Sequence, residues 1–259
     1  MKTIILCGGQ GTRLREETEY KPKPMVEIGG KPILWHIMKL FSHYGYREFI
    51  LALGYKGDII RDYFLNYKFY NNDFTIKLDN NENVIFHTHN EEKDWVVTLV
   101  ETGIDSMTGF RTKLCEKYIY EDDFMLTYGD AVSDININEL VKFHKKQNTI
   151  GTVTGVFPPS RFGDLNVEGD FVLKFKEKII DTENQPPING GFFVFKKEFL
   201  TVLENRTNLV LEKEPMDLLV DKKQLSVYRH KGFWQCMDTY RDFVFLNDLW
   251  KNNPGWNIW

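Results

Sequence analysis

The sequence has few cysteines, and no spacing among them would suit a metal or a disulfide framework. Cys7, Cys115 and Cys236 are scattered over 259 residues, and no C-x-x-C pair occurs. This pattern argues against a structural zinc site and a disulfide framework. An odd, scattered set of cysteines is typical of a reducing compartment, so we expect a cytoplasmic protein.

The sequence also lacks long apolar runs and an excess of positive charge. The first apolar run starts at Thr3, with no charged leader before it, and no run approaches the length of a membrane span. We therefore expect no targeting segment and no membrane attachment. The formal net charge is -4, which argues against a general nucleic-acid binder but leaves local basic clusters free to bind a small anion.

Two common nucleotide-binding motifs are missing from a turn that otherwise suits a phosphate. Gly8, Gly9 and Gly11 follow the first apolar run, and Thr12 and Arg13 come directly after them. The spacing matches neither G-x-G-x-x-G nor G-x-x-x-x-G-K-[ST], which counts against a dinucleotide-dependent oxidoreductase and a P-loop enzyme. Glycine still allows close backbone approach, and free N–H groups with a nearby cation favour an anion. A plain structural turn remains the alternative.

Apolar runs and helical patterns alternate along most of the chain. Short apolar runs bounded by Gly, Asp or Pro predict buried strands at Thr3–Cys7, Glu48–Leu53, Phe124–Tyr128 and Thr149–Phe157. Helical patterns lie between them, at Pro32–Tyr44, Asp58–Tyr67 and Asn138–Gln147. This alternation predicts an α/β fold with a doubly wound, mixed but mostly parallel sheet. The length suits a single domain over residues 1–259.

The rhythm is broken around residues 70–100, where short strand-like runs are separated by polar turns, and we expect a small β-rich insertion there. Further strands are expected at 165–167, 171–176, 191–195 and 226–230, and a helix at 212–223. A C-terminal helical segment is expected around residues 239–259. The tryptophans of its tail are expected to pack on the same domain, although a partner is the alternative.

A second basic stretch follows the glycine turn. Lys21, Lys23 and Lys31 are interleaved with Pro22, Pro24 and Pro32. Proline restricts the backbone, so a lysine between two prolines is held in place rather than solvated freely. Such a lysine suits contact with a polyphosphate, and a solvated surface loop is the alternative reading.

These stretches resemble the signature of the sugar-1-phosphate nucleotidyltransferases. The resemblance rests on Leu6-Cys-Gly-Gly-Gln-Gly-Thr-Arg-Leu and on Lys21-Pro-Lys-Pro-Met-Val, whose continuation to Met38 is similar to the branch that uses CTP and glucose 1-phosphate. It continues in order through Thr102-Gly-Ile-Asp-Ser-Met-Thr-Gly-Phe-Arg, Thr127-Tyr-Gly-Asp, Ile188-Asn-Gly-Gly-Phe-Phe-Val and Gly232-Phe-Trp-Gln-Cys-Met-Asp. It therefore covers nearly the whole chain.

The resemblance implies a fold and a reaction. It implies the Rossmann-like nucleotide-diphospho-sugar transferase fold and a Mg²⁺-dependent attack of the sugar 1-phosphate on the α-phosphorus of CTP, with release of pyrophosphate. It also implies a homo-oligomer that supplies CDP-glucose for bacterial surface polysaccharide. A thymidylyltransferase or uridylyltransferase remains the nearest alternative. A catalytically silent nucleotide-binding subunit is an alternative of another class.

The resemblance also assigns the site residues. Arg13, Lys23, Asp130 and Asp238 are expected to be catalytic, and the two aspartates to hold the metal, although an aspartate after a strand is otherwise often a helix N-cap. The expected nucleotide-binding residues are Leu6, Cys7, Gly8, Gly9, Gln10, Gly11, Thr12, Arg13, Lys23, Ser106, Arg111 and Gly129. The expected sugar-phosphate-binding residues are Glu177, Lys178, Asn189, Gly190 and Trp234. From the residues alone, Arg111 and the Glu177-Lys178 pair could equally be solvated surface.

Overall fold

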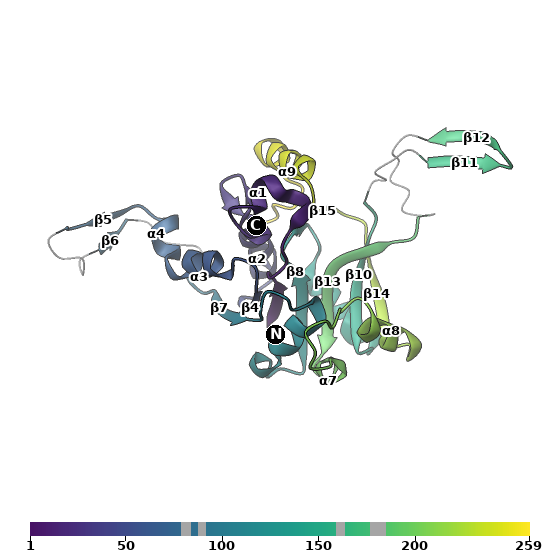
Figure 1. Cartoon of the computed structure of the whole chain (residues 1–259), viewed down its shortest axis with the longest axis horizontal. Helices are drawn as coiled ribbons and strands as arrows, with labels where there is room; N and C mark the ends of the chain where they lie inside the picture. Colours follow the sequence, from purple (N-terminus) through teal and green to yellow (C-terminus); the bar gives the residue numbers. More distant parts are fainter. Residues whose placement is uncertain (79–83, 88–91, 159–163, 177–184) are drawn as a thin grey trace.

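The computed structural model describes residues 1–78, 84–87, 92–158, 164–176 and 185–259. Its centre is a seven-stranded sheet in the order β14-β10-β13-β8-β1-β4-β7 (Figure 1). The strands are β1 Thr3–Leu6, β4 Glu48–Leu53, β7 Val96–Glu101, β8 Asp123–Tyr128, β10 Gly151–Val156, β13 Ile188–Lys196 and β14 Leu225–His230. Among them only β13 runs antiparallel to its neighbours. The predicted mixed, mostly parallel sheet is confirmed.

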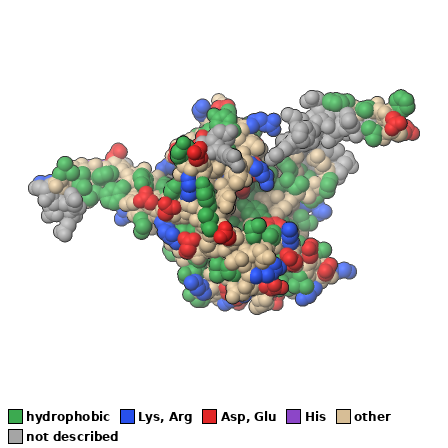
Figure 2. All heavy atoms as spheres, in the orientation of Figure 1, with side chains coloured by type: hydrophobic (Ala, Val, Ile, Leu, Met, Phe, Trp, Pro, Cys, Tyr) green, Lys and Arg blue, Asp and Glu red, His purple; other side chains and the backbone are tan. Residues whose placement is uncertain are grey.

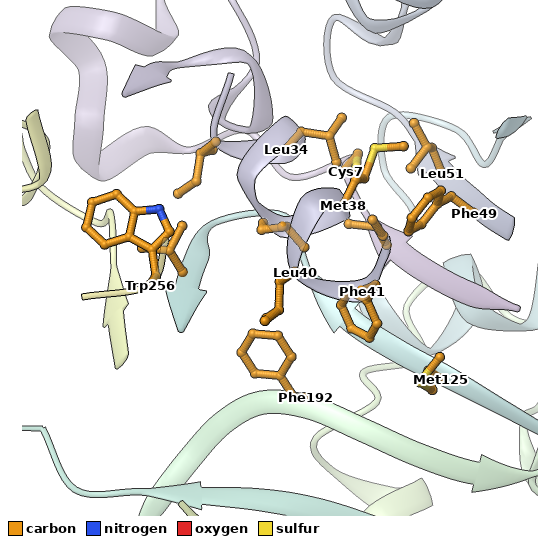
Figure 3. Close-up of a cluster of buried hydrophobic side chains, with 14 of the residues drawn as sticks. Cys7, Leu34, Met38, Leu40, Phe41, Phe49, Leu51, Met125, Phe192 and Trp256 are labelled. Atoms are coloured by element: carbon orange, nitrogen blue, oxygen red, sulfur yellow. The ribbon is translucent and has the colours of Figure 1, made fainter. Parts of the chain in front are cut away.

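The central strands are buried on both faces, which explains why they are continuous apolar runs. Ile5, Leu51 and Met125 point into one apolar cluster with α2 (Ile33–His43). Their neighbours in sequence point into a second cluster on the other face. Figure 3 shows the first cluster, where Leu34, Met38, Leu40 and Phe41 of α2 lie over the strands. Two buried faces make the sheet doubly wound.

The remaining elements connect and cover this sheet. The longer helices are α3 Gly57–Leu65, α5 Thr108–Leu114, α6 Ile137–Gln147, α8 Glu214–Asp221 and α9 Tyr240–Asn252. The short ones are η1 Thr12–Leu14, α1 Arg15–Thr18, η2 Lys23–Met25, α4 Tyr67–Asn71, η3 Glu116–Tyr118 and α7 Phe199–Val202. Small paired strands are β2 Glu27–Ile28 with β3 Lys31–Pro32, and β9 Ala131–Ser133 with β15 Trp234–Cys236. Within the described part of the chain no helix has the length and hydropathy of a membrane span.

The β-rich insertion is smaller than the sequence predicted. The run at 95–100 was expected to belong to it, but β7 pairs in parallel with β4 along its whole length and forms the edge of the central sheet. The tandem valines of this run suit a strand at the edge of a parallel sheet as well as a strand of a hairpin, so the local pattern does not distinguish the two. The part that projects from the central sheet is α4 together with the ribbon of β5 (Phe74–Ile76) and β6 (Val84–Phe86) (Figure 1).

A second ribbon projects at the other end of the molecule. It pairs β11 (Asp164–Glu168) with β12 (Phe171–Lys176) as an antiparallel sheet of its own (Figure 1). Several of its apolar side chains are exposed, with 77% of Phe171 and 65% of Phe175 accessible to solvent. Figure 2 shows hydrophobic side chains along both projecting ribbons.

The C-terminal segment packs on its own domain, as expected. α9 begins with a capping box, in which the Thr239 hydroxyl and the Asp242 carboxylate each accept the other's backbone N–H. Beyond the helix, Trp256 is 1% exposed and donates its indole N–H to His36 Nδ1 at 3.3 Å. The tail therefore covers helix α2.

Candidate active site

The glycine turn forms one side of a cavity of about 340 Å³. Neighbouring parallel strands position the turn. The Cys7 N–H donates to the Ala52 carbonyl at 3.0 Å, and the Gly129 N–H donates to the Leu6 carbonyl at 3.1 Å. The lining residues are Leu6, Cys7, Gly8, Gly9, Gly11, Thr12, Arg13, Lys23, Pro24, Ser106, Met107, Thr108, Arg111, Tyr128, Gly129, Asp130 and Asp238. Of the expected nucleotide-binding residues, only Gln10 lies elsewhere, in a neighbouring hollow with Thr18 and Tyr55.

Lys23 lies at the centre of the charged part of this cavity. Its ammonium nitrogen is 2.7 Å from Asp130 Oδ2 and 2.6 Å from Asp238 Oδ1. Only 13% of its side chain is exposed. Burial by itself would lower the pKa of Lys23, but the two carboxylates outweigh burial and raise it. The lysine therefore stays charged and holds both aspartates together.

Local structure explains how Lys23 is held. It begins the short helix η2, in which Met25 N–H donates to the Pro22 carbonyl at 2.8 Å and Val26 N–H to that of Lys23 at 3.0 Å. Pro22 sets the extended entry to this turn and Pro24 is buried beside the cavity. The proline-braced loop that the sequence predicted is confirmed in its geometry.

Asp238 reaches the site through a small ribbon. Asp130 ends the turn after β8, and the next residues form β9, which pairs with β15. The Met237 N–H then donates to the Asp130 carbonyl at 2.8 Å, so that the two aspartates lie side by side. Neither aspartate caps a helix, because Thr239 is the N-cap of α9 and Asn136 that of α6.

Arg13 stands at the mouth of the cavity. Its side chain is 77% exposed, and Nη1 lies 3.3 Å from Asp238 Oδ2. Burial by itself would raise the pKa of Asp238, but Lys23 and Arg13 hold it below its usual value. A partly exposed guanidinium group has donors left for an anion entering from solvent.

Arg111 differs from the solvated alternative that the sequence left open. It is 4% exposed, and burial lowers the pKa of its guanidinium group. Nη1 donates to Leu53 O at 2.9 Å and to Gly103 O at 2.8 Å, and Nη2 donates to Gly8 O at 3.0 Å. The guanidinium group thus ties the glycine turn to the neighbouring loop.

The expected sugar side is only partly described. Asn189 donates its Nδ2 to the Tyr128 hydroxyl at 3.3 Å and accepts the Gly191 N–H at 2.9 Å, and the Trp234 indole donates to Gly190 O at 2.8 Å. Glu177 and Lys178 lie outside the described residues. Sequence reasoning did not single out Tyr128, although its place directly before Gly129 and Asp130 at a strand end could have indicated it.

The donor set suits a magnesium ion. Two carboxylate oxygens already converge on one cationic nitrogen, and Mg²⁺ is commonly bound by one or two carboxylates with phosphate oxygens and water. Among the described residues no group of three or more His, Cys, Asp or Glu is arranged to hold a metal. Asp130 and Asp238 are the carboxylates among the residues that line the cavity, so they are the residues that would hold it.

Comparison with known proteins defines the class first. The family described as nucleotidyl transferase matches residues 2–250, and the chain belongs to this family. The inositol-1-phosphate CTP transferase structure from T. maritima has the same fold, with a TM-score of 0.65 at 16% identity over 97% of this chain and 96% of that one. The Rossmann-like fold expected from the resemblance is confirmed.

Relatives in sequence narrow the class. The chain is 46% identical over 261 aligned positions to the glucose-1-phosphate cytidylyltransferases of Salmonella typhi and Salmonella typhimurium. Each alignment covers 100% of this chain and 100% of the relative. The resemblance to the branch that uses CTP and glucose 1-phosphate is thereby confirmed.

Proposed function

We propose that this protein joins CTP and α-D-glucose 1-phosphate to form CDP-glucose and pyrophosphate. The observation that carries the proposal is the convergence of Lys23, Asp130 and Asp238 on the cavity under the glycine turn. That convergence occurs in a chain similar over its whole length to glucose-1-phosphate cytidylyltransferases. The presence of Asp130 and Asp238 together with the cations Arg13 and Lys23 counts against a catalytically silent subunit.

The reaction brings one anion against another, so positioning and charge neutralisation carry most of the catalysis. Arg13 and Lys23 bind the triphosphate and neutralise charge that develops on the departing pyrophosphate. Asp130 and Asp238 would hold Mg²⁺, and the bound ion would supply positive charge to the phosphate oxygens. The sugar phosphate oxygen attacks the α-phosphorus in line with the leaving group, and no covalent enzyme intermediate is needed.

The two substrates occupy different parts of the proposed site. The backbone of Leu6 to Gly11, together with Ser106, Arg111 and Gly129, surrounds the nucleotide. The sugar phosphate lies toward Asn189, Gly190 and Trp234. The resemblance adds Glu177 and Lys178 to this set of residues. We also propose that the enzyme works in the cytoplasm, as a homo-oligomer.

A substrate panel tests the proposal. The purified chain is incubated with glucose 1-phosphate, Mg²⁺ and one of CTP, UTP, dTTP or ATP, and pyrophosphate release is measured. We expect kcat/KM for CTP to exceed that for each other triphosphate by about tenfold or more, the factor that about 1.4 kcal/mol of base recognition supplies. Equal or greater turnover with dTTP or UTP would point to the alternative base, and no turnover with any of them would reject the enzyme assignment.

A further inference from the structure

Tyr128 lies between the two halves of the candidate site. It ends strand β8, and its ring packs against the backbone of Gly191, where an added Cβ atom would come within 2.5 Å of the ring. Gly191 has a φ of 79°, so glycine suits this position on both counts. The ring therefore has a defined place on the wall of the cavity.

The Tyr128 hydroxyl links two side chains that are far apart in sequence. It donates to Glu212 Oε1 at 2.5 Å and accepts from Asn189 Nδ2 at 3.3 Å. The Asn189 carbonyl oxygen accepts the Gly191 N–H at 2.9 Å. The nitrogen and the oxygen of the Asn189 amide therefore each make one hydrogen bond within the protein. One N–H and one oxygen lone pair of this amide remain for a sugar phosphate.

Glu212 is itself tied to the nucleotide side. The Thr108 hydroxyl donates to Glu212 Oε2 at 2.7 Å, and it accepts the Leu211 N–H at 2.9 Å. Thr108 begins helix α5, which follows Ser106 in the loop that lines the cavity.

The segment that carries Glu212 also caps this helix through its backbone. The Met107 N–H donates to Thr207 O at 2.8 Å, and the Gly109 N–H donates to Leu209 O at 3.0 Å. These bonds satisfy N–H groups that a helix leaves free at its start. Residues 207–212 are therefore docked on the nucleotide loop, and Glu212 extends from them to Tyr128.

We propose that Glu212 is a positioning residue that aligns the sugar-facing amide of Asn189 with the nucleotide loop, acting through Tyr128 and Thr108. This inference rests on the proposed function, because it assigns Asn189 to the sugar phosphate. An ionised carboxylate only accepts hydrogen bonds, so it forces the Tyr128 hydroxyl to donate to it. The hydroxyl lone pairs then face the Asn189 N–H, which determines how the amide is turned.

A kinetic double-mutant cycle with Glu212→Ala and Tyr128→Phe tests the linkage. We expect each variant to raise the KM for glucose 1-phosphate about tenfold, as loss of one charge-assisted hydrogen bond would, with the KM for CTP changed less than about twofold. The double variant should resemble the single variants, because both changes break the same chain of contacts. Glu212→Gln should recover part of the affinity, since its amide oxygen can still accept from Tyr128, whereas its amide nitrogen cannot accept from the Thr108 hydroxyl.

Glu214→Ala is the matched control, because Glu214 is an exposed glutamate two positions away that pairs with Arg206 at 3.1 Å. Equal effects of Glu212→Ala and Glu214→Ala would overturn the inference. So would effects of Glu212→Ala and Tyr128→Phe that simply add, or an equal rise in KM for both substrates.

The same cycle is also run on the free energy of unfolding, which needs no turnover. If the wild-type chain releases no pyrophosphate in the substrate panel, the proposed function fails. In that event a coupled unfolding cycle still supports the Glu212–Tyr128 link, and an additive one overturns it.

Discussion

Lys23 carries the central charge of the candidate site. Its ammonium group lies between two carboxylates that would otherwise repel each other across a half-buried cavity. An uncompensated pair of like charges in such a place is destabilising. The lysine and a divalent cation can therefore each neutralise the same two aspartates.

Replacing Lys23 by methionine removes its ion pairs with Asp130 and Asp238. In EDTA this should lower the free energy of unfolding by about 1–2 kcal/mol, a modest loss because solvent partly screens both ion pairs. Mg²⁺ should restore much of that loss by binding Asp130 and Asp238. Urea unfolding in EDTA and in Mg²⁺ measures both effects. Lys21→Met is the control, because the Lys21 ammonium nitrogen pairs with a carboxylate oxygen of the exposed Glu27, at 3.2 Å. Identical responses of the two variants would contradict the assignment.

His36 is the buried histidine that holds the C-terminal tail. Its Nε2 lies 2.9 Å from the Ile28 carbonyl, and its Nδ1 accepts the Trp256 indole N–H. This pairing requires the neutral ring with its proton on Nε2. Burial lowers the pKa of His36 from 6.5 to about 4.

The folded chain should therefore bind fewer protons at this site than the unfolded chain between pH 6.5 and about 4. The contribution to stability is fully present above pH 6.5 and is lost as the pH falls through this window, by up to about 3 kcal/mol. Unfolding of wild type and His36→Gln as a function of pH measures the difference. The comparison is needed because burial also lowers the pKa of His144, which is present in both proteins. The difference between the two proteins therefore reports on His36 alone. The same pH dependence in both proteins would contradict this prediction.

At the scale of the structural elements, the two adjacent glycines of the glycine turn have different surroundings. A Cβ atom on Gly8 would lie 2.1 Å from Arg111 Nη1, whereas one on Gly9 would meet no atom within 4 Å. The Arg111 guanidinium group cannot move aside freely, because it is buried and bound to several backbone oxygens. Gly8 is thus needed for close packing under the turn.

Gly8→Ala should therefore lower the free energy of unfolding by about 2–3 kcal/mol, a cost typical of overpacking a buried site. Gly9→Ala has the same chemistry without the collision and should change it by less than about 0.5 kcal/mol. Urea denaturation of the two variants gives the comparison. Similar losses in both would indicate that the backbone of the turn, rather than Arg111, sets the requirement.

At the scale of the whole molecule, the two ribbons are its most unusual surface. An isolated two-stranded ribbon is marginally stable in water, and the ribbon of β11 and β12 exposes Phe171, Leu173 and Phe175 by more than half. Exposed apolar surface of this kind is typical of contacts between chains. This surface supports the proposed homo-oligomer.

Light scattering should give a mass of at least two chains of 30.6 kDa for the wild type. Phe171→Ser with Phe175→Ser should shift the distribution toward the single chain, because it removes apolar area from the ribbon. Tyr20→Ser, which removes an exposed aromatic ring outside both ribbons, should leave the mass unchanged. A wild-type mass of one chain would contradict the oligomer.

The sequence by itself determined the α/β class, the central strands β1, β4, β8 and β10, and the loops that carry Lys23 and Asp130. These follow from local patterns, such as apolar runs between glycines and prolines, which depend on a few neighbouring residues. It placed the run at 95–100 wrongly, because an edge strand of a parallel sheet and a strand of a hairpin look alike over six residues.

Only the tertiary structure decided which side chains meet. Lys23 contacts partners 107 and 215 residues away, and no local pattern encodes the pairing of β9 with β15 that brings Asp238 to Asp130. The same holds for Glu212, an unremarkable charged residue in sequence that becomes a link because its segment docks on helix α5. Such long-range contacts arise from packing the whole chain, and so they appear only once the chain is folded.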